Sequence, residues 1–84
     1  MVRMEAVFGC AEGMTPDVAA KLAQLSEHFA AQLQLECGGK RVRLDSLIGI
    51  LSVECRRGTP LAIVADGEDE QVAAGAIRAL IEGE

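Results

Sequence analysis

The chain has 84 residues, of which half are apolar and a quarter charged, and it carries a net charge of −5. An acidic chain with two Phe and no Trp or Tyr is poorly suited to bind phosphate backbones or to stack on bases, which argues against a nucleic-acid partner. No apolar run approaches the roughly 20 residues of a membrane span, and the first residues alternate in hydropathy. We therefore expect no membrane segment and one cytoplasmic domain over residues 1–84.

The first part of the chain predicts a strand followed by a helix. One apolar face, Val2, Met4, Ala6 and Phe8, alternates with Arg3, Glu5 and Val7, which is typical of a strand with one buried face. Thr15 suits a helix N-cap, Pro16 the first helical position and Asp17 the first turn. Apolar residues then recur at helical spacing, which predicts an amphipathic helix from about residue 16 to residue 29.

The remainder predicts a hairpin, a short helix, a further strand and a last helix. Alternation over residues 33–44 flanks Gly38-Gly39, which can take the positive φ values of a two-residue turn. Ser46 can cap a short apolar helix, and a fourth strand follows over residues 61–65. The last helix is expected to present to the core a face made of Val72, Ala73, Ala76, Ile77, Leu80 and Ile81.

The predicted order is β-α-β-β-α-β-α, which indicates an α+β fold. For this element order, a four-stranded antiparallel sheet packed against helices is the simplest layered arrangement. A small sheet buries one face most simply under helices, so we expect the three helices to lie on one face.

Three stretches of the chain occur at similar spacing in one known family. They are LECGGKRVRL at residues 35–44, LDSLIGILSV at 44–53 and ADGEDE at 65–70. These stretches look like a central hairpin, a short middle helix and a strand-to-helix corner. Taken with the element order, they resemble the HPr family, the histidine-containing phosphocarriers of the bacterial sugar phosphotransferase system. The resemblance covers essentially the whole chain and implies a single HPr-like domain, an open-faced β-sandwich.

The start of the first helix departs from the family signature. That signature reads Gly, an apolar residue, His, Ala, Arg, Pro, and this chain has GMTPDV at residues 13–18. Aligned on the first glycine, the phosphorylated histidine of the family falls at Thr15 and the arginine at Asp17. The resemblance therefore implies a site whose shape is kept while its reactive side chain and its positive charge are replaced.

These two replacements argue against a phosphocarrier. Imidazole forms a labile P–N bond, whereas a threonine hydroxyl such as that of Thr15 would form a stable ester. Asp17 would repel a phosphoryl group, since two unit charges about 4 Å apart interact by ~1 kcal/mol in water and ~4 kcal/mol near a protein surface. We expect an HPr-like regulatory or adaptor protein, comparable to catabolite-repression HPr homologues that lack the histidine, with no enzymatic activity and no catalytic residue.

Ser46 and the apolar residues after it are the remaining candidate functional residues. In Gram-positive members of the HPr family, the serine at this position is phosphorylated by HPr kinase/phosphorylase, and the product acts with the catabolite control protein. The resemblance thus makes Ser46 a candidate for regulatory phosphorylation. It implies protein partners, either these two proteins or other phosphotransferase-system components, that would contact Thr15, Asp17, Leu47, Ile48 and Leu51.

The cysteines and the first strand leave two other functions open. Three cysteines with wide spacing, together with a single histidine, argue against a disulfide framework or a zinc site. We expect reduced thiols, no metal and no cofactor. Cys10, ahead of the first helix, could serve a small thiol-based enzyme or redox sensor. The other alternative is a purely structural subunit that assembles through exposed sheet or helix surface, and exchange of the first strand about Gly9 is one geometry for it. We expect the chain to be a monomer or a weak or strand-swapped homodimer.

Overall fold

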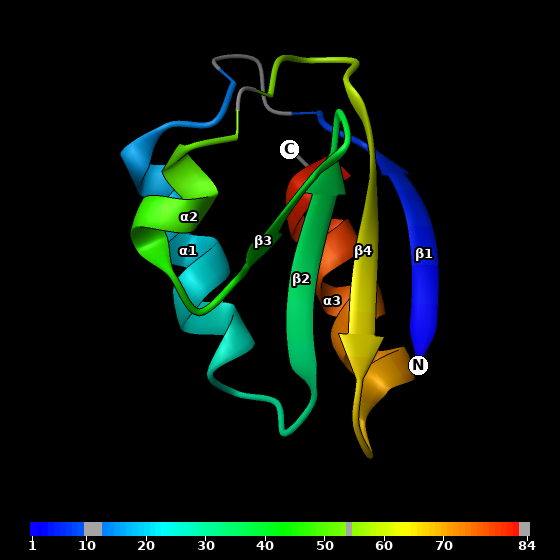
Figure 1. The fold of residues 1–84 in the computed structure, drawn as a ribbon. Coiled ribbons are helices and arrows are strands. Elements are labelled where there is room, and N and C mark those ends of the chain that lie inside the picture. Colours follow the sequence, from blue (N-terminus) through cyan, green and yellow to red (C-terminus); the bar gives the residue numbers. More distant parts are fainter. Residues whose placement is uncertain (10–12, 54, 83–84) are drawn as a thin grey trace.

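The computed structural model of the chain describes residues 1–9, 13–53 and 55–82, and its elements follow the predicted order (Figure 1). Their bounds are β1 (Val2–Val7), α1 (Pro16–Ser26), β2 (Gln32–Cys37), β3 (Lys40–Arg43), α2 (Leu47–Leu51), β4 (Pro60–Asp66) and α3 (Glu70–Glu82). None of the helices within the described ranges is long and apolar enough to cross a bilayer.

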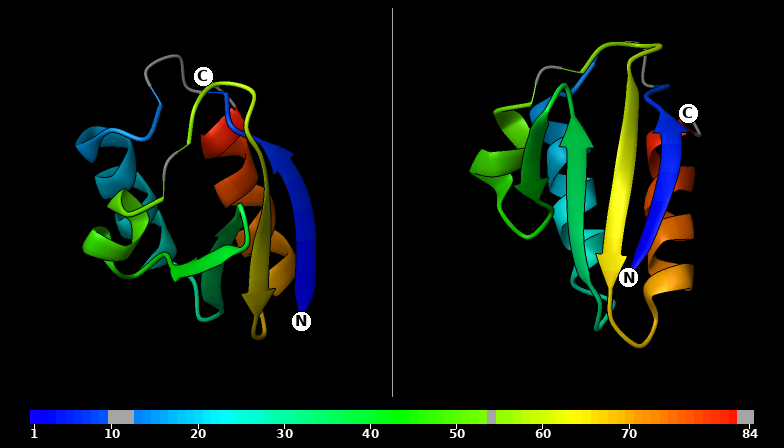
Figure 2. Two further views of the ribbon diagram at one scale, coloured as in Figure 1. Left: turned by 45° about the horizontal axis from the view of Figure 1, so that its top comes forward. Right: turned by 45° about the vertical axis from the view of Figure 1, so that its right-hand side comes forward.

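The strands form one four-stranded antiparallel sheet in the order β1-β4-β2-β3. The last strand, β4, is therefore inserted between β1 and β2 and pairs with both. Helices α1 and α3 lie behind one face of the sheet, and α2 lies against α1 near the β3 edge (Figure 1, Figure 2). This arrangement confirms the predicted α+β fold and the open-faced β-sandwich.

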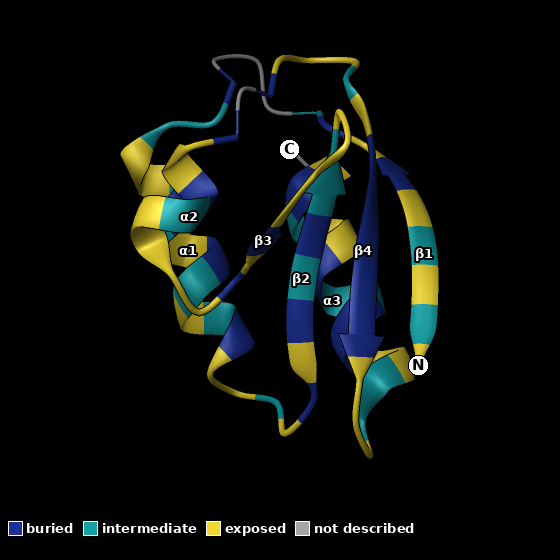
Figure 3. Cartoon of the chain, viewed as in Figure 1, coloured by how far each residue is buried: buried dark blue, intermediate teal, exposed yellow. Residues whose placement is uncertain are grey.

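The core lies between the helices and the sheet and consists almost entirely of aliphatic side chains. Strand β4 is buried along most of its length, since it is covered by the helices on one face and by its neighbours' side chains on the other (Figure 3). The largest fully buried side chains are Phe8, Leu22, Leu35, Leu44, Ile50, Ile63, Ile77 and Ile81.

The face of the sheet that carries no helix is crossed by an ion-pair cluster centred on Glu36. Its carboxylate accepts hydrogen bonds from Arg3 on β1 and from Arg41 on β3, the latter at 3.1 Å. The Arg3 guanidinium, followed by that of Arg41, holds the pKa of Glu36 below its ordinary value. Because both guanidinium groups are exposed, these ion pairs contribute little to stability.

The hairpin between β2 and β3 has the predicted two-residue turn. Gly38 and Gly39 have φ values of +60° and +81°, in the left-handed region that a side chain disfavours. The turn sets the register that places Glu36 opposite Arg41 and Cys37 opposite Lys40.

Helix α1 ends at Ser26, earlier than the predicted end near residue 29. The amides of Glu27, His28 and Phe29 donate to the carbonyls three residues back, at 3.2, 3.1 and 3.4 Å, so the last turn tightens and the α-helix stops. Phe29 nevertheless packs against the core, which explains why the apolar spacing extends past the helix.

The core face of α3 differs from the prediction at Val72, which is 68% exposed. Val72 precedes the fully buried Ile77 by five residues, which places it roughly 140° around the helix from that side chain. Ala74 lies closer to the Ile77 direction and is buried instead. The core face of α3 therefore consists of the buried Ala73, Ala74, Ile77 and Ile81.

Asp69 joins the α1–β2 connection to the start of α3. Its two carboxylate oxygens accept hydrogen bonds from the backbone amides of Ala30 and Ala31, at 2.9 and 2.8 Å. These amides, first that of Ala30, hold the pKa of Asp69 below its ordinary value of 3.8. The sequence alone indicates only acidic residues in the first turn of a helix, because the partners of Asp69 lie 38 and 39 residues away.

We expect Asp69→Asn to lower the urea midpoint of unfolding at pH 7 and to weaken the response to acid. A folded-state pKa below the unfolded one gives stability that is complete above the ordinary pKa and is lost as pH falls through the folded value. The difference between native and variant should therefore shrink between pH 5 and pH 3, as measured by circular dichroism. Glu68→Gln, at the exposed neighbouring residue, is the matched control. Equal midpoints for Asp69→Asn and Glu68→Gln at pH 7 would contradict this role.

Candidate functional site

The first turn of α1 is capped by Thr15, as the sequence predicts. The Thr15 backbone is extended, with φ −99° and ψ 164°, and its Oγ1 accepts a hydrogen bond from the Val18 amide at 3.3 Å. The Thr15 carbonyl accepts from Ala19 at 2.9 Å, and Pro16 occupies the first helical position. Asp17 is exposed in the first turn. We refer to Thr15, Pro16 and Asp17 as the α1 tip, which offers a hydroxyl and a carboxylate.

Backbone contacts with the loop that precedes β4 fix the position of the α1 tip. The Met14 amide donates to the Cys55 carbonyl at 3.2 Å. Gly13 has φ +79°, and a Cβ added there would lie 2.7 Å from the same carbonyl oxygen. Only glycine fits this approach, so the position of the α1 tip depends on a backbone contact far along the chain.

Ser46 caps α2 in the same way that Thr15 caps α1. Its Oγ accepts a hydrogen bond from the Gly49 amide at 3.2 Å, and its carbonyl accepts from Ile50 at 3.0 Å. The Ser46 residue is exposed. The neighbouring Asp45 carboxylate is paired with the Arg43 guanidinium at 2.8 Å, so its negative charge next to Ser46 is balanced locally.

Helix α2 divides its apolar side chains between the core and solvent. Ile50 is fully buried, whereas Leu47, Ile48 and Leu51 are 44%, 83% and 40% exposed. We call these three exposed residues the α2 patch. The sequence alone could not sort them, because five residues make too short a helix for a periodicity to be read. The exposure of α2 is evident in Figure 3.

The structure brings the α1 tip and the α2 patch to one side of the molecule, since α1 and α2 pack together (Figure 1, Figure 2). His28 is exposed beyond the other end of α1, past the C-cap Glu27. Cys10, the candidate thiol of the sequence analysis, lies outside the described residues.

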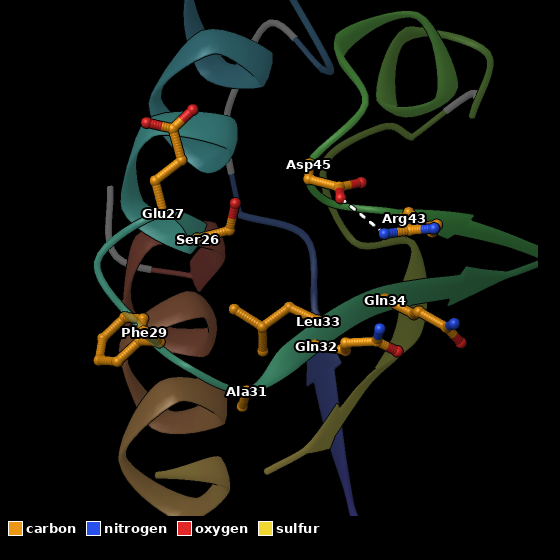
Figure 4. A pocket seen from close by; sticks show the side chains of 9 residues that line it. All are labelled: Ser26, Glu27, Phe29, Ala31, Gln32, Leu33, Gln34, Arg43 and Asp45. Atoms are coloured by element: carbon orange, nitrogen blue, oxygen red, sulfur yellow. Dashed lines mark hydrogen bonds and ion pairs between the residues drawn. The ribbon is translucent and has the colours of Figure 1, made fainter. Parts of the chain in front are cut away.

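A pocket of about 170 Å³ lies at the far end of α1, away from its tip (Figure 4). The Ser26 hydroxyl in its wall already donates to the Ala23 carbonyl at 2.7 Å, and Arg43 is engaged by Asp45. Three of its polar side chains, those of Ser26, Arg43 and Asp45, are thus engaged within the protein. We assign this pocket no part in the candidate site.

Two cysteines that are far apart in sequence lie together in the fold. Cys37, at the end of β2, and the buried Cys55 have their Sγ atoms 4.0 Å apart. Burial, and then the neighbouring Cys37, raises the pKa of the Cys55 thiol to about 12. Spacing alone did not indicate this pair. The proximity of the two cysteines follows from the pairing of Glu36 with Ala62, which places the end of β2 beside the start of β4.

The fold and the residues before and after the α1 tip match one protein family. The family model described as the phosphotransferase-system HPr component phosphorylation site matches residues 2–83, so the chain belongs to the HPr family. Two relatives span nearly the whole chain. Phosphocarrier protein HPr of Borreliella burgdorferi is 32% identical, covering 98% of this chain and 95% of its own. HPr-like protein Crh of Bacillus subtilis is 31% identical, covering 100% and 99%.

Solved structures lead to the same family. HPr of Bacillus anthracis has a TM-score of 0.90 at 28% identity and covers 95% of both chains. Crh of Bacillus subtilis, described as a catabolite repression protein that forms a swapped, intertwined dimer, has a TM-score of 0.78 at 33% identity and covers 83% of this chain and 80% of its own. The relatives therefore include both phosphocarriers and Crh, and the predicted family resemblance is confirmed.

Proposed function

We propose that this member of the HPr family is a regulatory or adaptor protein of the cytoplasm and not a histidine phosphocarrier or an enzyme. The observation that carries the proposal is the α1 tip. Thr15 and Asp17 stand where the family signature has its histidine and arginine. The Thr15 hydroxyl is moreover used as the cap of α1.

The chemistry of the α1 tip supports this proposal. A carrier must take up and release the phosphoryl group at similar free energy, which imidazole allows and an alcohol does not. The α-helix dipole supplies only about half a positive charge at the tip, and Asp17 already offsets it. Incubation of the native chain with enzyme I and phosphoenolpyruvate should therefore leave it unmodified in a mass spectrum. An acid-labile phosphoryl group on the native chain would overturn the proposal.

The α2 patch supports protein binding as the function that remains. Leu47, Ile48 and Leu51 are exposed apolar side chains on a helix that packs against α1. Exposed apolar surface with polar surroundings is typical of a protein interaction site. We propose that partners contact this patch together with Thr15 and Asp17. The candidates are HPr kinase/phosphorylase, a catabolite control regulator or other phosphotransferase-system proteins.

We further propose that phosphorylation of Ser46 regulates this binding. Ser46 is exposed and lies directly before the α2 patch, so a phosphate there would change the charge of the surface that a partner meets. The pairing of Asp45 with Arg43 weakens the repulsion that Asp45 would otherwise exert. The likeness to Crh, over the whole chain, is in keeping with this regulatory role.

HPr kinase/phosphorylase with ATP should add one acid-stable phosphoryl group to the native chain and none to Ser46→Asn. Asparagine caps helices as well as serine does, so this variant should keep its stability. Ser46→Ala should lose both the phosphoryl group and about 1 kcal/mol of stability. Ser52→Ala is the matched control, because Ser52 lies at the other end of α2 and bonds to Gly49. A phosphoryl group on Ser46→Asn, or none on the native chain, would contradict the assignment.

The association state of the chain can be argued from its relatives and from the contacts of Gly9. Crh of Bacillus subtilis is described as a swapped dimer, and a second Crh structure is described as a dimer. In the present fold Gly9 follows β1 and donates its amide to the Ile81 carbonyl at 3.0 Å. Release of this contact would free β1 to pair with β4 of a second copy. We propose a monomer in exchange with such a homodimer, and light scattering over a concentration series tests it.

A further inference from the structure

Cys37 is the last residue of β2, and Cys55 lies in the segment that leads into β4. The Sγ atoms are 4.0 Å apart, and the Cys37 thiol also faces the Pro60 carbonyl at 4.0 Å. A disulfide bond is about 2.05 Å long, so the two sulfurs must approach by about 2 Å. Side-chain rotation at the half-buried Cys37 supplies movement of this size.

We propose that Cys37 and Cys55 are a redox modification site, at which exchange with a low-molecular-weight disulfide such as oxidised glutathione joins their sulfurs in a reversible intramolecular disulfide. This modification goes beyond the regulatory role proposed above and does not depend on it. The observation that supports the proposal is the approach of the two sulfurs to 4.0 Å, with one thiol half-buried and the other buried.

The two thiols differ in access, which sets the order of the steps. Cys37 is partly exposed and Cys55 is 5% exposed, so the Cys37 thiolate attacks first. It breaks the glutathione disulfide, forms a mixed disulfide on Cys37 and releases one glutathione thiolate. Cys55 then loses its proton to solvent and attacks the Cys37 sulfur, releasing the second glutathione; because burial raises the pKa of the Cys55 thiol, this is the slower of the two steps. In total two protein thiols are oxidised and one glutathione disulfide is reduced to two thiols.

The position of Cys55 gives the modification a structural consequence at the α1 tip. The Cys55 carbonyl accepts the Met14 amide at 3.2 Å and faces Gly13 closely. A disulfide would fix Cys55 to the end of β2. It would thereby also fix the Cys55 carbonyl, to which the segment before Thr15 is hydrogen-bonded. Oxidation should therefore hold the Met14 amide more firmly, because local opening of this loop becomes harder.

The test is peptide mapping of the full chain after incubation with oxidised glutathione and alkylation of free thiols. Trypsin cleaves after Arg3, Lys21, Lys40, Arg43 and Arg56, so each cysteine falls on its own peptide: residues 4–21, 22–40 or 44–56. We expect residues 22–40 and 44–56 to appear as one linked species that separates on reduction. Linkage through residues 4–21, or native protein that stops at glutathione attached to Cys37, would overturn the proposal.

Three variants separate the roles of the cysteines. Cys10→Ser should form the same link as the native chain. Cys55→Ala, with circular dichroism to confirm its fold, should accumulate the mixed disulfide on residues 22–40, and Cys37→Ser should resist modification at Cys55. Rapid modification of Cys55 in Cys37→Ser would overturn the order of attack. Hydrogen exchange of the Met14 amide should be slower in the oxidised chain, and an unchanged rate would refute the coupling to the α1 tip.

Discussion

The double variant Thr15→His/Asp17→Arg should gain an acid-labile phosphoryl group from enzyme I and phosphoenolpyruvate, under conditions that leave the native chain unmodified. The imidazole supplies the nucleophile and the labile P–N bond, and the guanidinium supplies the positive charge. Asp17 is exposed, so its repulsion of a nearby unit charge is near the lower value of about 1 kcal/mol, or roughly fivefold in rate. Mass spectrometry before and after acid treatment measures the modification.

The two single variants show how much of this phosphorylation depends on the imidazole nucleophile and how much on the positive charge. Asp17→Arg alone should remain unmodified, because it has a cation and no imidazole at the α1 tip. Thr15→His alone should be phosphorylated at least severalfold more slowly than the double variant. A double variant that folds, as judged by circular dichroism, and yet accepts no phosphoryl group would refute the view that this tip has the shape of a carrier site and lacks only its side chains.

The elements and their caps could be predicted from the sequence because their signals are local. Thr15 and Ser46 each precede the amide that they cap by three residues, and the Gly38-Gly39 turn lies directly between the two strands that it joins. The family resemblance placed the α1 tip and the candidate phosphorylation site for the same reason, since each is a short, continuous stretch of chain.

What could not be predicted depends on contacts between distant segments. The early end of α1 reflects the turn that brings Ala30 and Ala31 to Asp69. The Cys37–Cys55 pair depends on the insertion of β4 beside β2, which no spacing in the sequence encodes. The sequence likewise could not show that Ile48 is exposed and Ile50 buried, because this depends on which side of a single helical turn faces the core.

Ile50→Ala and Ile48→Ala should separate stability from partner binding, although the two residues lie on the same five-residue helix. Ile50 is fully buried, so its truncation leaves a cavity and should lower the free energy of unfolding by about 2–5 kcal/mol. Ile48 is 83% exposed, and its truncation should change that free energy by less than about 0.5 kcal/mol. Urea unfolding followed by circular dichroism measures both values.

The order of the two variants should be reversed for partner binding, where Ile48→Ala should have the larger effect. Only the Ile48 side chain is exposed and able to contact a partner. Truncation of an interface anchor weakens binding by more than about 1 kcal/mol, so Ile48→Ala should slow phosphorylation of Ser46 by HPr kinase/phosphorylase at least about fivefold at limiting protein. Ile50→Ala should react at the native rate at a temperature where it is fully folded, since its side chain contacts no partner. If Ile48→Ala is phosphorylated as fast as the native chain, the α2 patch is not the docking surface for this enzyme, and its exposed apolar side chains need a different partner.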